Sequence, residues 1–395
     1  MSCEVFQDFE RLAPLRQAWD DAVLRTGGSV YMTYDWVRLW WQFYGGTAQL
    51  RVFVFSAGGL VVAVLPLYID TLGWGPARLR VARLVGSNIP PKVFDPPVPA
   101  NMAGDLFAAV LGRLFTRERC DLLSLGPVSE RHLPLSALRI ACERQPGLAG
   151  LIDALDGVYS VFRLPASMEE YFGTLSKKES KNRKYYVRLL KKECGAGIDV
   201  VTDADAVVRE FELFAEQHRQ QWHAEGRPGH FGAWPQALDF NRALVEAQAR
   251  LGRVRFIRTL ADGRVIAYQY VFAFGDRYYW ELPSRAVEPK WERFSLGPTG
   301  IVTMIAEGIA ERMAEVEGGL GHYDYKVRLG ATECPARTYR ILRAGLSPRM
   351  RFGAFSAVAT VVRLAYHKLW YRRIAPRLPP AFWRPQWRMW LRLDF

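Results

Sequence analysis

The sequence predicts an α/β fold of two related domains, each with a mixed central sheet flanked by helices. Three observations indicate this: strand-rich runs meet at glycine turns, segments with a 3.6-residue apolar period lie between them, and one hairpin pattern occurs twice. With 395 residues, of which 50% are hydrophobic, the chain is long enough to form two ordinary cores.

The two hairpins occupy similar places in the two halves of the chain. Residues 51–70 hold two β-rich runs around a Gly-Gly turn, and residues 254–280 hold three around an Asp-Gly and a Gly-Asp turn. Residues 59–63 align with residues 263–267, a domain-length spacing of 204 residues. We therefore expect a duplicated unit, with an N-terminal domain over residues 1–155 and a C-terminal domain over residues 156–345.

Helical periodicity fills the spaces between the predicted strands. Apolar residues recur every three or four positions, which is typical of a helix with one buried face, over residues 102–117, 168–194, 204–224, 235–251 and about 299–315. Strands mixed with covering helices indicate a layered fold.

Composition indicates the cellular compartment and makes disulfides, metal sites and membrane spans unexpected. The five cysteines stand singly, with no Cys-x-x-Cys spacing, so we expect free thiols in a reducing compartment and no metal. The first residues lack a basic segment followed by an apolar one, so we expect no secretory signal. The apolar run 352–362 has eleven residues, whereas a membrane span needs roughly 20. We expect a cytoplasmic protein, peripheral on the inner face of the plasma membrane.

The net charge of +13 is concentrated at the carboxyl end. Residues 340–395 hold twelve Arg and Lys against one acid, Asp394. A short helix opened by Pro385 would gather two tryptophans beside two arginines: Trp387, Trp390, Arg388 and Arg392. Residues 346–395 are therefore predicted to form a basic amphipathic tail that binds an anionic membrane surface. A basic cover over the second domain and a contact with RNA are the alternatives.

Residues 176–192 are predicted to form a helix with one concentrated cationic face. The segment holds eight basic residues and one acid. At 100° per residue, six of the basic residues fall within a stripe about 100° wide: Lys177, Lys181, Lys184, Arg188, Lys191 and Lys192. Because like charges at i, i+4 repel, we expect this face to meet an anion, namely substrate phosphates, lipid headgroups or RNA. A solvated helix face is the alternative.

A turn between a predicted strand and a predicted helix is the candidate anion site. It comprises Arg293, Ser295, Gly297 and Gly300. Glycines in such a turn let backbone N–H groups approach a pyrophosphate at a helix amino end, where the helix dipole favours negative charge.

Candidates for acid/base chemistry are few. None of the six histidines stands in a hydrolytic triad order or in a His-Glu-x-x-His motif. His218, His223 and His230 lack a carboxylate at ligand spacing, so no metal site is expected. Asp324 stands among apolar and aromatic residues, where a carboxylate with a raised pKa would act as a base. A capping role, or a pair with Lys326, is the alternative.

These segments resemble the CelD-type branch of the GNAT acyltransferases, named for cellulose biosynthesis, and its Fem-type aminoacyltransferase relatives. The resemblance covers about residues 30–345 through diffuse patterns. It is carried by the tryptophan-rich run 34–45, the basic helix, His218 to Trp222 with Gly226, the segments 263–268 and 278–280, Glu288-Pro289, residues 295–298, and Asp324, which matches a strand-borne Asp.

The resemblance implies tandem GNAT-like domains that transfer an acyl group from acyl-CoA to an amine without a metal. It implies a donor pyrophosphate held by Arg293, Ser295, Gly297 and Gly300. It implies a substrate facing Lys177, Lys181, Lys184, Arg188 and Trp222, with Asp324 or His218 as the acid/base group.

The acceptor is expected to be the amine of a cell-envelope precursor, either an amino sugar or a long-chain amino lipid such as a sphingoid base. The donor carrier is CoA or an acyl-carrier protein. Two alternatives stay open. One is Fem-type transfer from aminoacyl-tRNA, in which the basic stripe contacts RNA. The other is a non-catalytic component of a polysaccharide or lipid assembly, because the donor turn departs from the usual Arg/Gln-x-x-Gly-x-Gly/Ala pattern.

Overall fold

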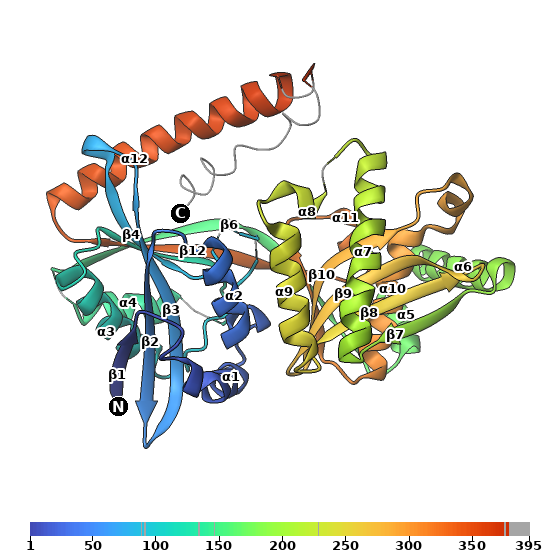
Figure 1. Cartoon of the computed structure of the whole chain (residues 1–395), viewed down its shortest axis with the longest axis horizontal. Coiled ribbons are helices and arrows are strands. Elements are labelled where there is room, and N and C mark those ends of the chain that lie inside the picture. The colour runs from blue at the N-terminus through green and yellow to red at the C-terminus, as the bar shows by residue number, and fades with distance from the viewer. Residues whose placement is uncertain are drawn as a thin grey trace. The chain divides into compact units, whose positions relative to one another are not determined.

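The computed structural model describes residues 1–87, 89–90, 92–132, 135–145, 147–227, 229–374 and 377–378 (Figure 1). It confirms the predicted α/β class, with a mixed sheet flanked by helices. The chain forms two compact units: unit 1 comprises Met1–Asp156 with Pro335–Phe395, and unit 2 comprises Gly157–Cys334. Residues 335–345, which we expected in the C-terminal domain, therefore belong to unit 1.

Unit 1 begins with the strand β1 and two helices, continues as an antiparallel meander, and ends with a helix, a parallel strand and a further helix. Its elements are β1 (Ser2–Phe6), η1 (Ala13–Leu15), α1 (Arg16–Arg25), η2 (Val30–Met32), α2 (Tyr34–Tyr44), β2 (Gln49–Ala57), β3 (Leu60–Leu72), η3 (Gly75–Ala77), β4 (Leu79–Leu84), α3 (Ala103–Thr116), β5 (Leu122–Ser129) and α4 (Leu135–Glu143). The strand order is β1-β2-β3-β4-β5-β12, in which β12 (Thr332–Arg343) comes from the end of the second half.

From β7 onward, unit 2 repeats this order of elements. It contains α5 (Met168–Thr174), α6 (Lys177–Cys194), β7 (Gly197–Val201), α7 (Ala204–Ala224), α8 (His230–Ala233), α9 (Ala237–Ala249), β8 (Val254–Ala261), β9 (Arg264–Phe274), β10 (Arg277–Arg285), η4 (Pro289–Phe294), α10 (Leu296–Ala310), β11 (Glu315–Leu320) and α11 (Asp324–Arg328). The strand order is β6-β11-β10-β9-β8-β7, in which β6 (Ala149–Arg163) comes from the end of the first half.

The two halves therefore exchange their last strands. In both halves, three antiparallel strands are followed by a helix and a parallel strand, because β4 pairs in parallel with β5 and β10 with β11. The aligned hairpin turns, around Gly59 and Gly263, both lie between antiparallel partners and both have a positive φ. The closing strands pair differently: β6, which follows α4, pairs with β11, whereas β12, which follows α11, pairs with β5.

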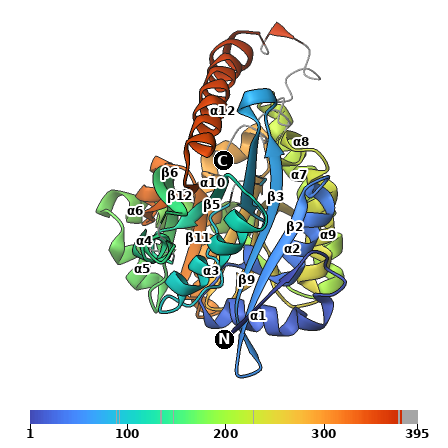
Figure 2. The ribbon, with the colours of Figure 1, turned by 90° about the vertical axis from the view of Figure 1, so that its left-hand side faces the viewer.

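Large aromatic side chains fix the helices of unit 1. Trp19 of α1 and Trp36 of α2 are fully buried, and Trp19 Nε1 donates to Met32 O at 2.7 Å. These helices lie on one face of the strands, while α3 and α4 lie on the other (Figures 1 and 2).

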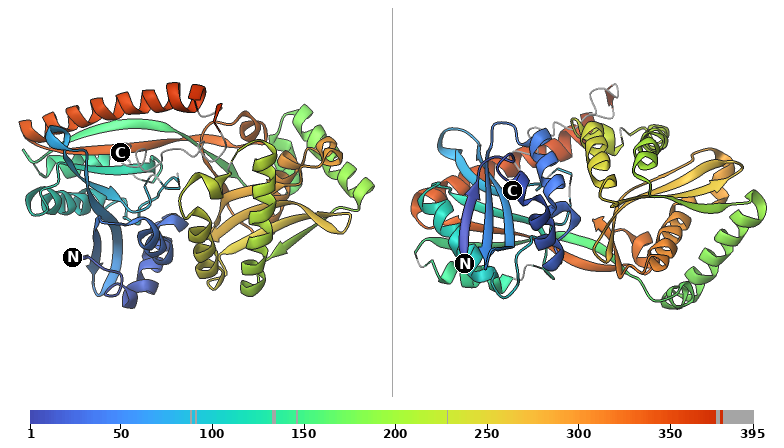
Figure 3. Two further views of the ribbon diagram at one scale, coloured as in Figure 1. Left: turned by 45° about the horizontal axis from the view of Figure 1, so that its top comes forward. Right: turned by 60° about the horizontal axis from the view of Figure 1, so that its bottom comes forward.

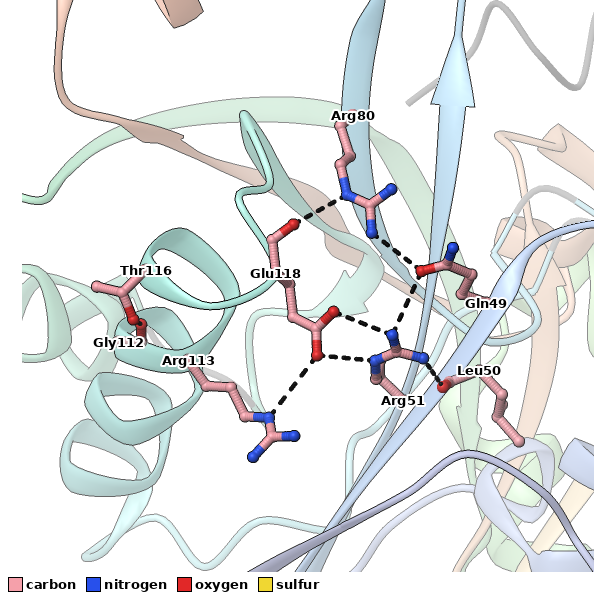
Figure 4. A network of polar contacts seen from close by, with 8 residues as sticks. All are labelled: Gln49, Leu50, Arg51, Arg80, Gly112, Arg113, Thr116 and Glu118. Carbon is pink, nitrogen blue, oxygen red and sulfur yellow. Dashed lines mark hydrogen bonds and ion pairs between the residues drawn. The ribbon is translucent and has the colours of Figure 1, made fainter.

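A polar network ties the end of α3 to the strands (Figure 4). Arg51 binds both Glu118 carboxylate oxygens, at 2.9 and 3.0 Å, and Arg80 Nε donates to Glu118 O at 2.9 Å. The hydrogen bond from Arg51 lowers the pKa of Glu118, against the effect of burial, with help from the charges of Arg113 and Arg80.

The basic tail begins as a long helix, α12 (Leu346–Leu364), followed by the π-helical stretch η5 (Ala365–Ile374). Phe355 of α12 is buried against Leu72, Leu79 and Leu122. In the described part of the chain, no helix has the length and apolar character needed to cross a membrane. The predicted helix at Pro385, with its tryptophans and arginines, lies outside the described residues.

The sheet of unit 2 has a different helix layer on each face. Phe211 and Phe214 of α7 contact Phe256 and Tyr270 on one face. On the other face, α10 buries Ile301, Val302, Met304 and Ile305 against a cluster that includes Val271, Tyr278 and Trp280. Figure 3 (right) shows the orange helix α10 and the yellow-green helices on opposite sides of the strands.

Candidate functional site

The predicted donor turn forms the beginning of α10 and is not an open loop. Ser295 has a left-handed backbone, with φ 53°, and is the residue that precedes the helix. Gly297 and Gly300, expected in the turn, therefore lie in the first helical turns. The helix starts at Leu296, three residues before our expectation, because Pro298 is tolerated in a first turn.

The two glycines of this helix face different surroundings. A Cβ built on Gly297 has nothing within 4 Å, so the backbone there is open to a ligand. A Cβ on Gly300 would lie 2.3 Å from Gln269 Nε2, so this glycine allows α10 to pack closely on β9. Gln269 Oε1 is buried and has no hydrogen-bond partner among the described residues.

The basic helix α6 begins at a break inside the segment that we predicted as one helix. We predicted one helix over residues 168–194, but α5 and α6 are separated at Leu175-Ser176. Ser167 accepts from Glu170 N and Ser176 accepts from Glu179 N, both at 3.2 Å. Two successive Ser-x-x-Glu caps therefore start two helices.

The break between α5 and α6 forms one wall of a hollow of about 600 Å³. Four cations predicted to face the substrate line it together: Lys177, Lys181, Lys184 and Arg188. The remaining lining residues in the described part of the chain are apolar or uncharged: Phe172, Gly173, Leu175, Ser180 and Tyr185. Lys184 Nζ lies 4.9 Å from the centroid of the Phe172 ring. The hollow thus offers concentrated positive charge beside an apolar wall.

Two arginine contacts join α6 to the beginning of α10. Arg183 is buried, forms an ion pair with Glu179 at 2.8 Å and donates to Ser295 Oγ at 3.2 Å. Arg293, which is 63% exposed, forms an ion pair with Glu193 near the end of α6. The predicted donor residues therefore lie next to the helix that carries the basic stripe.

Strands β10 and β11 separate within unit 2. They pair in parallel only from Arg277 to Tyr279 and from Glu315 to Glu317. Beyond that point β10 has a bulge between Trp280 and Leu282, and β11 has an irregularity between Glu317 and Leu320. Two parallel strands that stop pairing leave backbone groups available to another molecule, as bulges near functional sites often do.

Lys326 lies beside both strands where they separate, and the sequence indicated it only as a partner of Asp324. Its side chain is buried, Nζ donates to Gly318 O of β11 at 2.5 Å, and Nζ lies 5.3 Å from the Trp280 ring centroid of β10. Burial lowers the pKa of Lys326 to about 8, although the charge of Glu317 acts in the opposite direction. At neutral pH the ammonium form therefore still predominates, and the neutral amine becomes the main form only above about pH 8.

Glu281 is a residue that the sequence did not single out. It is the bulge residue of β10, directly after Trp280. Burial, and after it the charge of Glu281, raise the pKa of Tyr270, whose ring contacts Phe211 and Phe214 of α7. A carboxylate at a bulge beside separating strands is well placed to accept a proton.

His218 is buried on the α7 side of the sheet. Its Nδ1 contacts Pro283 O at 2.9 Å, and its Nε2 lies 3.4 Å from His230 N. Burial lowers the pKa of His218 to about 4, against the opposing effect of the Pro283 carbonyl. The ring is therefore neutral at physiological pH, with Nδ1–H donating to Pro283 and Nε2 as the acceptor.

Trp222 belongs with His218 and not with the hollow. Its ring lies 6.0 Å from His218 and 5.4 Å from His230, measured between centroids. Apart from Asp324, the predicted site residues thus lie in two places on opposite faces of the sheet: the hollow with the beginning of α10, and the cluster of His218 with Trp222.

Asp324 does not have the enclosed setting that we expected. It is the first residue of the short helix α11, not part of a strand, and its side chain is 84% exposed. Its carboxylate contacts His322 Nε2 at 3.1 Å. The aromatic neighbours in sequence do not bury it, because Tyr325 packs on the core of unit 2 while Asp324 faces outward.

Within unit 2, residues 177–327 match the family model described as an acetyltransferase (GNAT) domain. The chain contains a GNAT acyltransferase domain. It is accordingly an N-acyltransferase, as the sequence predicted. No curated protein matches the chain significantly.

Two solved structures share the fold of most of this chain. FemX is 9% identical with a TM-score of 0.60, covering 85% of this chain and 96% of its own. The C-terminal domain of a putative lysylphosphatidylglycerol synthetase from Agrobacterium fabrum is 13% identical with a TM-score of 0.53, covering 89% and 96%. At these identities the likeness shows the fold alone.

Proposed function

We propose that the acyltransferase domain moves an acyl group from acyl-CoA to the amine of a cell-envelope precursor. The observation that carries this proposal is the opening between β10 and β11 beside the amino end of α10. A thioester lying in that opening would meet unpaired strand backbone, while its pyrophosphate would meet helix N–H groups.

The donor is assigned to the beginning of α10. Gly297 leaves the backbone accessible, Ser295 is fixed by Arg183, and Arg293 lies on the exposed side. Gly300 supports the site indirectly, because it seats α10 on β9. An acyl-carrier protein would deliver the same thioester through its phosphopantetheine arm.

In the proposed reaction, the amine nitrogen attacks the thioester carbonyl and its surplus proton passes to a base. The C–S bond then breaks, and the departing thiolate takes up a proton. Glu281, half-buried at the bulge, and the buried, neutral His218 are candidates for the base. Asp324, the other candidate from the sequence, would act from an exposed position.

The hollow suggests what the acceptor carries. Lys177, Lys181, Lys184 and Arg188 provide charge for phosphates, and Phe172 and Leu175 provide an apolar wall. A lipid-linked or nucleotide-linked amino sugar, or an amino lipid at an anionic surface, fits this pairing. We therefore keep the CelD-type, envelope-directed assignment, in a protein held on the inner face of the plasma membrane by its tail, residues 346–395.

Thermal unfolding with acetyl-CoA, a long-chain acyl-CoA and free CoA tests the donor. A donor present at 100 times its Kd adds about 2.7 kcal/mol to stability. We expect Arg293→Ala to lose this gain and Arg250→Ala to keep it. Arg250 is a matched control, because it is 71% exposed and pairs with one glutamate, Glu246. Equal shifts in both variants would contradict the assignment.

Single-turnover kinetics with a saturating donor test the base. We expect Glu281→Gln to reduce the rate by about 10²-fold or more, and Asp324→Asn to reduce it less than about threefold. His218→Asn distinguishes a catalytic base from a residue that only supports the fold, because only the loss of a base changes how the single-turnover rate depends on pH. A large loss in Asp324→Asn alone would return the role to that residue.

Fem-type transfer is the second candidate, favoured by the structural likeness to FemX and by the cationic hollow. In that case tRNA binds in place of CoA, and its affinity falls steeply with salt. Replacing Lys181 and Lys184 by Glu would abolish tRNA binding and leave any CoA-induced thermal shift intact.

A further inference from the structure

Helix α12 of unit 1 has two apolar faces, and one of them is turned outward. The inner face packs on unit 1 through Phe355, which is 2% exposed, with Phe352 and Ala359 against the same cluster. At 100° per residue, these three side chains and Pro348 lie within about 60° of one another. A helix that served only as a cover would be polar on its opposite side.

The opposite side carries an apolar stripe about 120° wide, which we call the outer stripe. It consists of seven apolar residues, with Ser347 as a polar residue at its beginning: Leu346, Met350, Ala354, Ala357, Val358, Val361 and Leu364. All seven are exposed, and the exposed fractions of the larger ones are 75% for Leu346, 65% for Met350, 39% for Val358, 66% for Val361 and 47% for Leu364. A continuous exposed stripe of this kind marks an interaction surface more often than scattered apolar residues do.

The positive charge of this segment indicates a partner with a negatively charged surface. Residues 346–378 contain seven basic residues and no acid: Arg349, Arg351, Arg363, Lys368, Arg372, Arg373 and Arg377. Arg351 pairs inward with Asp121, whereas Arg349 and Arg363 are exposed and lie beyond the edge of the outer stripe. Long arginine side chains keep their charge in a headgroup layer while the helix lies below it.

The hairpin between β3 and β4 adds an aromatic residue beside α12. Trp74 is 77% exposed at its tip. The tip touches the helix, because a Cβ on the adjacent Gly73 would lie 3.1 Å from Phe355 Cδ2. Figure 1 shows this hairpin crossing α12 at the same edge of unit 1. Tryptophan favours the boundary between water and hydrocarbon.

We propose that the outer stripe lies flat in the headgroup region of a bilayer rich in anionic phospholipid. A second copy of the chain fits less well, because pairing two such helices would bring arginines against arginines. This inference deepens the proposed membrane location by assigning it to α12. It does not depend on the donor or on the acid/base residues.

Vesicle flotation of the full chain tests the proposal. The vesicles contain phosphatidylcholine alone or phosphatidylcholine with about one third phosphatidylglycerol. We expect binding to the second kind only, weakened at least about tenfold by Val361→Glu. Leu60→Glu is the matched control, because Leu60 is also 66% exposed in unit 1 and undergoes the same change, and we expect it to bind like wild type. Circular dichroism and thermal unfolding without vesicles are measured on both variants to check that they fold like wild type.

Three outcomes would overturn the proposal. The first is equal binding by wild type and Val361→Glu, which would assign the membrane contact to residues 379–395 alone. The second is equal binding to both kinds of vesicle. The third is a concentration-dependent dimer that Val361→Glu dissociates while vesicle binding is unchanged, which would make the outer stripe a self-association surface. The donor-induced thermal shift is measured on the same variants, so that a failure here is separable from a failure of the proposed function.

Discussion

The buried lysine between the separating strands predicts a specific pH dependence of stability. Lys326 has a pKa of about 8 in the folded chain, against an ordinary value of about 10.4. The unfolded chain therefore binds this proton more tightly than the folded chain does. The unfolding free energy is therefore highest above about pH 10.4, falls as the pH decreases from there, and reaches its lower value once the pH has passed below 8.

The effect is isolated by comparison with Lys326→Met, which keeps most of the volume and cannot titrate. Between pH 7 and pH 9, wild type should gain about 1.4 kcal/mol of unfolding free energy relative to the variant, and by pH 10 about 2.5 kcal/mol. The hydrogen bond to Gly318 O is lost in the variant at every pH. Its loss therefore displaces the curve without changing its slope.

Urea unfolding of both proteins at pH 7, 8, 9 and 10 measures the difference. Lys290→Met is the control, because Lys290 is 55% exposed and pairs with Asp262 on the surface. Its curve should run parallel to wild type up to pH 9. Parallel curves for wild type and Lys326→Met would refute the reasoning, since they would mean that the ammonium group is solvated in the folded chain.

Three further predictions follow from the same geometry. Gly297→Ala should leave the thermal stability unchanged or raise it by up to about 1 kcal/mol, whereas Gly300→Ala should lower it by about 1–2 kcal/mol as Gln269 is displaced; equal effects would contradict the packing of α10. Between pH 7 and pH 4.5, wild type should lose about 2 kcal/mol of unfolding free energy relative to His218→Asn, because burial keeps the pKa of His218 near 4. Urea unfolding at both pH values measures this, and an equal difference between the two proteins at both pH values would mean that the ring is hydrated. Glu118→Gln should cost about 2 kcal/mol at pH 7, since it removes the charged partner of Arg51, and a neutral result in chemical denaturation would mean that the network of Figure 4 contributes little.

Much of the fold was predictable because its signals are local. Turns at Gly59 and Gly263 marked equivalent hairpins, and 3.6-residue periodicity gave α7 with its observed bounds, Ala204–Ala224. The exchange of β6 and β12 was not predictable, because nothing in a strand's own residues specifies a partner far away in the sequence. The break at Leu175 was findable, since Ser167 and Ser176 each precede a glutamate by three residues.

The same distinction between local signals and tertiary packing applies to the candidate site. The cationic face was predicted, since spacing along one helix brings Lys181, Lys184 and Arg188 to one side, but the hollow at the break before that helix was not. Glu281 and Lys326 were not, because a bulge and a buried ammonium group arise from strand pairing and tertiary packing. Asp324 misled for the same reason, since aromatic neighbours in sequence are not necessarily neighbours in space.

The exchange of closing strands has a consequence for synthesis on the ribosome. Strand β5 needs β12 as its partner, and about 200 residues must be translated between them, which takes about 10–40 s at usual elongation rates. During that interval the nascent chain presents the unpaired edge of β5, a surface prone to association with other chains. A message truncated before codon 335 would leave that edge permanently open. Premature termination is therefore expected to yield aggregates and not a functional first half.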